Sequence, residues 1–259
     1  MKKVFIFLSF SIFLSSCSKD KNGKTSFAVA PESLVAYMKS KIIEEPDATV
    51  SIFANKLSGS SQALPLIQIS GSLNAKLGNG SIIKQISVAD INLPRLFDST
   101  GNKYFFQTSY NGDKGFGQKN KVDFLTDLFD LKTDFQLPEL ITLKTENSMI
   151  SKSKGFHLYW NKDESNTLPV QITLNFDEIS STYLDPNFPK MNGIVQFSKF
   201  VEDSGEYTIS PSELSSFPSK GIAIISITRG NFMYQKISDK NMLIYSLATD
   251  TNSSLHLSE

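Results

Sequence analysis

Alternation of apolar and polar residues is the main pattern in the chain after about residue 47. In Ala48–Leu57 the apolar residues Val50, Ile52 and Ala54 recur at every second position, and Gly155–Asn161 shows the same spacing. Successive side chains of a strand point to opposite faces, so this spacing predicts strands that are buried on one face only. We therefore expect a mainly β protein with two β-rich domains.

The predicted strands form two groups, and the pattern changes near Gln136–Pro138. An Asn-Gly turn at Gly78–Gly80 predicts a hairpin in the first group. Gly230-Asn231 is a predicted turn that ends a strand in the second group. The first group is Ala48–Leu57, Leu64–Leu77, Ser81–Leu93 and Lys103–Tyr110; the second is Leu140–Lys144, Gly155–Asn161, Val170–Phe176, Gly193–Phe200, Tyr207–Ile209, Gly221–Arg229 and Leu243–Thr249, with Ser254–Leu257 as a further edge.

One or two short helices are expected in the first domain. Pro31–Glu45 has apolar residues three and four apart, and Pro31 suits a first helical position. A strand through Ser33–Ile43 is the alternative, because this segment contains good strand formers. Asn120–Leu131 is a second candidate helix, with Asn120 as its cap.

About seven short strands separated by turns between residues 138 and 259 resemble an immunoglobulin or fibronectin type III sandwich. The turn Asp203-Ser204-Gly205, a short strand and a long apolar strand that ends at Arg229-Gly230 resemble a pattern in uncharacterised bacterial envelope lipoproteins. That resemblance implies no activity. We expect a β-rich domain at 27–137 and an immunoglobulin-like sandwich at 138–259.

The first sixteen residues have the layout of a secretory signal peptide. Lys2 and Lys3 precede an apolar run, Val4–Leu14, and small residues follow it. A run of about eleven residues at ~1.5 Å each is too short to cross a hydrocarbon core of ~30 Å. Residues 1–16 are therefore expected to be removed.

Leu14-Ser15-Ser16-Cys17 resembles the lipobox of bacterial lipoproteins. The resemblance implies cleavage between Ser16 and Cys17, a diacylglycerol thioether on Cys17, and acylation of its amine by a fatty acid such as palmitate. Cys17 is the only cysteine, at the position that the motif needs. The alternative is an ordinary signal peptide, or a buried strand, with an incidental cysteine.

Residues 17–26 are mostly polar and charged, which predicts a flexible tether between the lipid and the folded body. A diacylglycerol supplies the two chains that stable anchoring needs. Ser18 directly after the cysteine resembles the sorting signal for the outer membrane. We expect a lipid-anchored protein of the cell outer membrane, facing either the periplasm or the surface.

Composition argues against several kinds of partner and cofactor. Loss of Lys2 and Lys3 lowers the basic side chains from 26 to 24, against 26 acidic ones. A near-neutral body lacks the concentrated basic charge that nucleic acid requires. With a single cysteine the chain has no disulfide framework, so its stability must come from hydrophobic packing.

Candidate catalytic groups are few, and no catalytic, metal-binding or cofactor-binding residue is predicted. The two histidines, His157 and His256, are expected on an exposed strand face and in a frayed tail. The serines of Ser58–Ser61 lack the G-x-S-x-G form of a nucleophile elbow. Most acids fall in turns, where calcium at Asp98–Asn102 or Asp203–Glu206 is an open alternative.

Tyr104, Phe106 and Tyr110 share one face of a predicted strand, and Phe116 lies in the glycine-rich loop that follows. These four aromatic residues form a candidate binding patch for a sugar or a protein. The alternative is that they pack into the core. We expect a non-catalytic role in adhesion, glycan capture or envelope assembly. The alternatives are a glycan hydrolase with paired carboxylates and an accessory subunit of a glycan-uptake complex.

The lipid anchor is tested by Cys17→Ala. The variant cannot form the thioether, so we expect it to lose labelling by a fatty-acid probe and to leave the membrane fraction. Metabolic labelling and fractionation measure both effects. A variant that still fractionates with membranes would contradict the lipid anchor.

Overall fold

The computed structural model describes residues 33–58, 64–73, 83–97, 104–127, 129–188, 195–237 and 239–259, and the side chains among these except 95–97 and 104–107. Residues Pro31–Glu259 form one compact unit. Ser16, Cys17, the tether and the Gly78–Gly80 turn lie outside the described residues. The expectation of a mainly β protein is confirmed, because strands and two short helices make up the described secondary structure.

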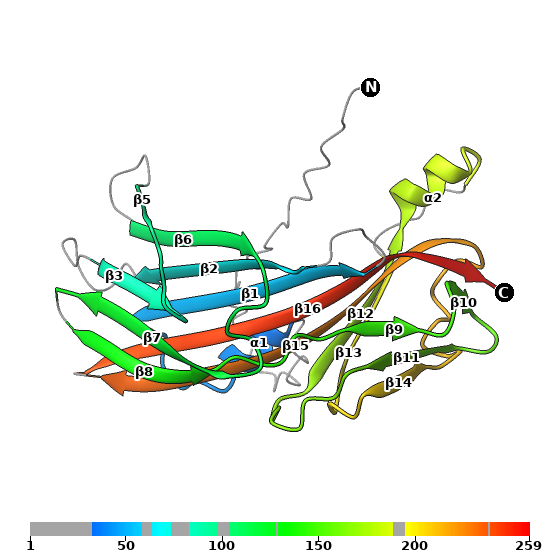
Figure 1. Ribbon diagram of the computed structural model, residues 1–259. Helices are drawn as coiled ribbons and strands as arrows, with labels where there is room; N and C mark the ends of the chain where they lie inside the picture. Colours follow the sequence, from blue (N-terminus) through cyan, green and yellow to red (C-terminus); the bar gives the residue numbers. More distant parts are fainter. Residues whose placement is uncertain are drawn as a thin grey trace, which may run out of the picture. The chain divides into compact units, whose positions relative to one another are not determined.

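Two long strands, β15 (Gly221–Ile237) and β16 (Lys240–Ser258), pair along their whole length as an antiparallel hairpin. They lie at the centre of a nine-stranded sheet in the order β13-β12-β15-β16-β1-β2-β6-β5, with β10 also paired to β16 (Figure 1). β1 and β10 both run parallel to β16. The other strands are β13 (Gln196–Val201), β12 (Val170–Asp177), β1 (Ala48–Ser58), β2 (Leu66–Leu73), β6 (Tyr104–Asn111), β5 (Arg95–Phe97) and β10 (Met149–Ser151).

Two smaller sheets pack against this large sheet and enclose two hydrophobic cores. The first core includes Val50, Phe124 and Ile244, and the second includes Trp160 and Ile225. The strands facing the first core are β4 (Ile91–Asn92), β3 (Ile83–Val88), β7 (Lys119–Thr126) and β8 (Asp130–Gln136); those facing the second are β14 (Glu206–Ile209), β11 (Phe156–Trp160) and β9 (Leu143–Thr145).

The expected boundary near residue 137 coincides with a change of core. The first core takes Leu137 and earlier residues, together with part of β16, and the second begins at Ile141. Because β15 and β16 run through both cores, residues 31–259 form one unit. The second core lies between two layers of strands, as in a sandwich. The strand order expected for an immunoglobulin-like domain is not confirmed, because β10 pairs with β16 in parallel whereas the sheets of that fold are antiparallel.

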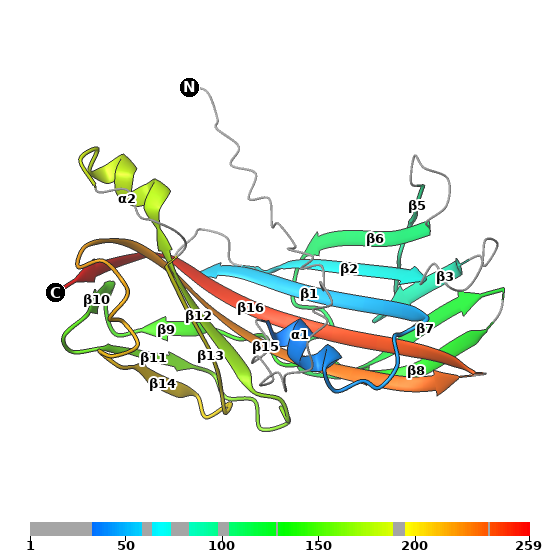
Figure 2. The ribbon, with the colours of Figure 1, turned by 180° about the vertical axis from the view of Figure 1, so that it is seen from behind.

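The predicted turn at Gly230-Asn231 is wrong, because both residues lie inside β15. A Cβ on Gly230 would lie 2.3 Å from Met38 Cε and 2.7 Å from Leu247 Cδ2. The glycine therefore makes room for helix α1 (Leu34–Lys39), which packs against β15 (Figure 2). The expectation of a helix in place of a strand is confirmed here, although α1 is shorter than Pro31–Glu45.

The predicted hairpin between the second and third strands is also wrong. β2 pairs with β1 and β6, whereas β3 pairs with β4 and β7 in another sheet. A Cβ on Gly71 would lie 2.2 Å from Ile86 Cδ1. The two strands therefore face each other across the core, and Gly71 permits this close approach.

Asn120–Leu131 is not a helix but β7 and the start of β8. Val122, Phe124 and Thr126 are buried at every second position, which is the spacing of a strand. The Asn120 side chain donates to the carbonyls of Gly115 and Gln118 in the preceding loop instead of capping a helix.

The expected frayed C-terminus is wrong as well. His256 lies within β16, paired with Met149 of β10 on one side and Ile222 of β15 on the other. The backbone N–H of His256 donates to the carbonyl of Ser148 at 2.7 Å. These ladder hydrogen bonds hold the last strand in place.

A buried ion pair lies in the middle of the long hairpin. The side chain of Arg229 on β15 is 0% exposed, and its Nε donates to Asp203 Oδ2 at 2.7 Å. Its Nη2 donates to the other oxygen of Asp203 at 2.9 Å, so the pair is bidentate. Trp160 Nε1 and Asn166 Nδ2 each donate to the same carboxylate at 2.8 Å.

The remaining donors of Arg229 hold the backbone of two other segments. Nη1 donates to the carbonyl of Glu139 at 3.3 Å, and Nη2 also donates to the carbonyl of Asn161. Glu139 lies between the residues of the two cores, and Asn161 follows β11. The Asp203-Ser204-Gly205 turn and the Arg229-Gly230 sequence therefore meet in one buried hydrogen-bond network, which we call the lock.

Arg229→Met tests this lock. Loss of the guanidinium leaves the Asp203 carboxylate buried without its counter-charge, so we expect the free energy of unfolding to fall by about 3–5 kcal/mol. Urea denaturation measures the change. Lys220→Met is the matched control, because it removes the exposed ion pair with Asp185 and should cost far less. Equal losses in the two variants would contradict the lock.

Candidate functional site

Of the four residues in the predicted aromatic patch, only Tyr110 and Phe116 have side chains that the structure describes. Tyr110 and Phe116 are partly buried and pack against the first core. Burial, with a smaller contribution from the charge of Asp113, raises the pKa of Tyr110. Tyr104 and Phe106 lie on β6, but their side chains are outside the described residues. For Tyr110 and Phe116 the alternative of packing into the core is the one observed.

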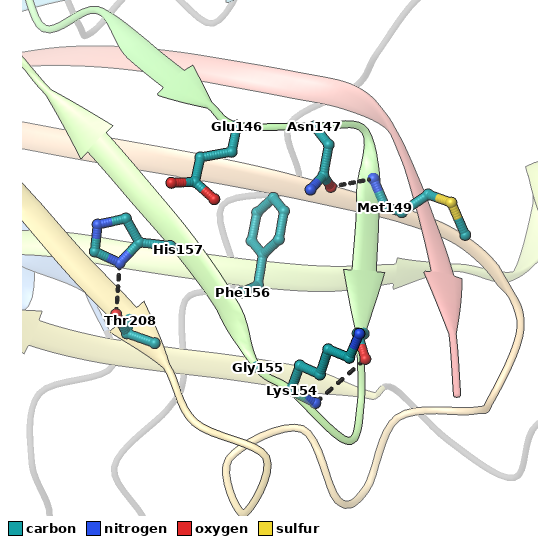
Figure 3. Close-up of a pocket in the computed structure, with 9 residues that line it drawn as sticks. Glu146, Asn147, Met149, Lys154, Gly155, Phe156, His157 and Thr208 are labelled. Atoms are coloured by element: carbon teal, nitrogen blue, oxygen red, sulfur yellow. Dashed lines mark hydrogen bonds between the residues drawn. The ribbon is translucent and has the colours of Figure 1, made fainter.

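A shallow hollow of about 260 Å³ lies where the chain passes from β9 to β10 and then to β11 (Figure 3). Residues at the start of β11 and in the Glu146–Ser151 segment line it. The polar and charged side chains around it include Glu146, Asn147, Lys154, His157 and Thr208.

Strand alternation positions His157 and Tyr159 beside this hollow. Phe156, Leu158 and Trp160 point into the second core, so His157 and Tyr159 occupy the opposite, partly exposed face of β11. This confirms the predicted strand face of His157. The two rings lie edge to face, with their centroids 4.3 Å apart.

Hydrogen bonds fix both rings. His157 Nδ1 lies 2.6 Å from Thr208 Oγ1, on the residue directly opposite in β14. His157 Nε2 lies 3.5 Å from Glu206 Oε2. The Tyr159 hydroxyl donates to Glu146 Oε1 at 2.8 Å. We call these five side chains (Glu146, Tyr159, His157, Thr208 and Glu206) the polar row.

The two carboxylates of the polar row act together on Tyr159. The hydrogen bond to Glu146, followed by burial and the negative charges of Glu146 and Glu206, raises the pKa of Tyr159. The single O–H of the phenol is therefore committed to Glu146, while its oxygen can still accept a hydrogen bond. The row combines two carboxylates, a phenol, an imidazole and a threonine hydroxyl.

Of the polar row, the sequence indicated His157 as an exposed strand residue and Glu206 only as the last residue of a possible calcium turn. Glu146 and Glu206 are far apart in the chain, and they lie on opposite sides of β11 because β14 and β9 pair with its two edges. The alternation of β11 could have indicated that Tyr159 shares a face with His157. Nothing local in the sequence identifies the two glutamates.

A second polar cluster joins β13 to β14 and has a structural explanation. Lys199 donates to Tyr207 at 2.6 Å and to Glu213 at 2.8 Å, and Ser210 also donates to Glu213. Burial would raise the pKa of Glu213, but hydrogen bonds from Lys199, Ser210 and Tyr207 outweigh it and lower this pKa to about 2. These polar groups hydrogen-bond to one another and come from two sheets, so the cluster links those sheets.

The structure bears on the metal alternatives. Within the described ranges no group of three or more His, Cys, Asp or Glu side chains could hold a metal ion. Calcium at Asp203–Glu206 is contradicted, because the Asp203 carboxylate is bound by Arg229, Trp160 and Asn166. Asp98–Asn102 lies outside the described residues.

No protein-family model matches the chain, and no curated protein matches it significantly. Among the residues that the structure describes, no helix is long and apolar enough to span a membrane.

Proposed function

We propose that the protein is a lipid-anchored component of the bacterial outer membrane whose β body binds a saccharide without altering it. The observation that carries this proposal is the polar row beside the hollow. Four of its five side chains stand on β11 and β14, whose other face packs into the second core, and Glu146 directly follows β9. Their positions are therefore set before a ligand arrives, which lowers the entropy cost of binding.

The chemistry of the polar row suits a sugar. Carboxylates accept hydrogen bonds from sugar hydroxyls, and the phenol oxygen of Tyr159 can accept one while its O–H donates to Glu146. An imidazole can donate at one ring nitrogen and accept at the other. The hollow, at about 260 Å³, is slightly smaller than the ~300–1,000 Å³ that drug-sized ligands occupy. It therefore fits one sugar unit of a longer glycan whose other units extend over the open surface.

The lipobox at Leu14–Cys17 supports the anchored location, and Ser18 supports the outer membrane. A tethered body that holds glycans serves adhesion or glycan capture, and the same surface could serve an accessory subunit of an uptake complex. Tethering also raises the effective concentration of the body at the membrane surface, so modest affinity for one sugar unit is sufficient.

A glycan array followed by titration of the mature lipoprotein in detergent tests the proposal. Glu146→Gln and Tyr159→Phe each remove a charged or hydrogen-bonding group, so we expect at least roughly tenfold weaker binding of the selected glycan, or about 1.4 kcal/mol. Glu202→Gln is the matched control, since Glu202 is an exposed glutamate of another loop. Absence of glycan binding, or equal affinity in all variants, would contradict saccharide binding at this row.

A second candidate function is glycan hydrolysis, favoured by the position of Glu146 and Glu206 on either side of the His157–Tyr159 pair. Hydrolases of this class use two carboxylates about 5–9.5 Å apart. Release of new reducing ends from the bound glycan, lost in Glu206→Gln while binding persists, would establish the hydrolase and exclude the purely binding role.

A further inference from the structure

Helix α2 (Glu178–Leu184) carries the largest group of exposed apolar side chains within one described element. Ile179 is 85% exposed, Tyr183 is 89% exposed and Leu184 is 64% exposed. Residues four apart lie on the same side of a helix, so Ile179 and Tyr183 project together, away from buried Ser181. Most large apolar side chains of the described unit are buried in its two cores.

The polar side of α2 is fixed to the rest of the body. Asp177 caps the helix by accepting from the Ser180 N–H at 3.0 Å. The Ser181 hydroxyl donates to the carbonyl of Asp177 at 2.6 Å and accepts from the Ile222 N–H of β15 at 2.8 Å. Because this side is held against β15, α2 cannot turn to bury its apolar side chains.

The length of chain between the lipid anchor and the first described residues allows α2 to contact the membrane. The first described residues join β12, where the Leu34 N–H donates to Gln171 Oε1 at 2.8 Å. From Gln171 to Asp177, which caps α2, the strand rises by only about 20 Å. Ser33 follows Cys17 by sixteen residues, a length that can extend to about 55 Å at most. The surface that receives the lipid is therefore within reach of α2.

We propose that α2 is a second membrane contact, in which Ile179, Tyr183 and Leu184 enter the headgroup region of the leaflet that holds the Cys17 lipid. This inference rests on the proposed lipid anchor. Tyrosine beside aliphatic residues suits the membrane interface, where one end of the ring is apolar and the other is wet. Three side chains are far fewer than the ~20–30 residues of a stable protein interface.

A membrane contact made by three side chains needs the lipid anchor in order to persist. Three inserted side chains bind a bilayer weakly on their own, but the tether holds them at high effective concentration near the leaflet. Contact through α2 orients the body, because α2 is fixed to β15 and the polar row lies on strands of the same unit. The sugar-binding surface would then face in a set direction relative to the membrane.

The test uses the full mature lipoprotein in vesicles of phosphatidylcholine. Tyr183→Cys introduces a site for a nitroxide label, since Cys17 is occupied by lipid. Power-saturation electron paramagnetic resonance compares accessibility to oxygen and to a water-soluble nickel complex. Glu164→Cys is the matched control, because its side chain is 82% exposed in the turn before β12, at the opposite end of that strand from α2.

We expect the nickel accessibility to be several-fold lower at 183 than at 164, and to rise when Ile179→Asp is added. Equal accessibility at the two positions in protein that floats with the vesicles would overturn the α2 contact while the anchor stands. Protein that does not float would overturn both. Shielding at 183 only in native membranes, and not in pure lipid, would overturn the lipid contact in favour of a protein interface.

Discussion

A fully buried guanidinium in the middle of the longest hairpin is the constraint on which the rest of the structure depends. Arg229 can remain charged without solvent only because Asp203 and the carbonyls of Glu139 and Asn161 surround it. Asp250, on the neighbouring strand β16, is also 0% exposed and accepts from Ser58 and from the Leu143 N–H. The two buried charges thereby fix the segment that leads from the first core to the second.

This lock explains how side chains beside a shallow hollow can be held in fixed positions. Four of the five side chains of the polar row stand on β11 and β14, and β11 ends next to Asn161, whose carbonyl is bound by Arg229. Trp160, the last residue of β11, donates to Asp203 and packs in the second core. The buried network therefore holds the strand that carries His157 and Tyr159. The saccharide binding that we propose would rest on preorganised hydrogen bonds and would not need a deep cavity.

Local periodicity in the sequence was enough to predict the β class, several strands and the exposed face of His157, because burial on one face of a sheet requires a two-residue repeat. It failed where partners distant in the chain decide the structure. Gly230 resembles a turn residue but makes room for Met38, and Gly71 makes room for Ile86. Glu146 and Glu206 come to flank β11 only through strand pairing, which no local pattern records. The sequence predicted that a strand ends at Arg229. The buried partner of Arg229 lies in a distant turn, so the local pattern does not show that the strand continues.

The central claim is that two cores and one continuous hairpin form a single unit that presents the site rigidly. Differential scanning calorimetry of the mature protein in detergent tests it most directly. A single unit should unfold in one transition whose calorimetric enthalpy equals the van't Hoff enthalpy. Two separable transitions, or a calorimetric enthalpy well above the van't Hoff value, would show two independent domains and contradict the account.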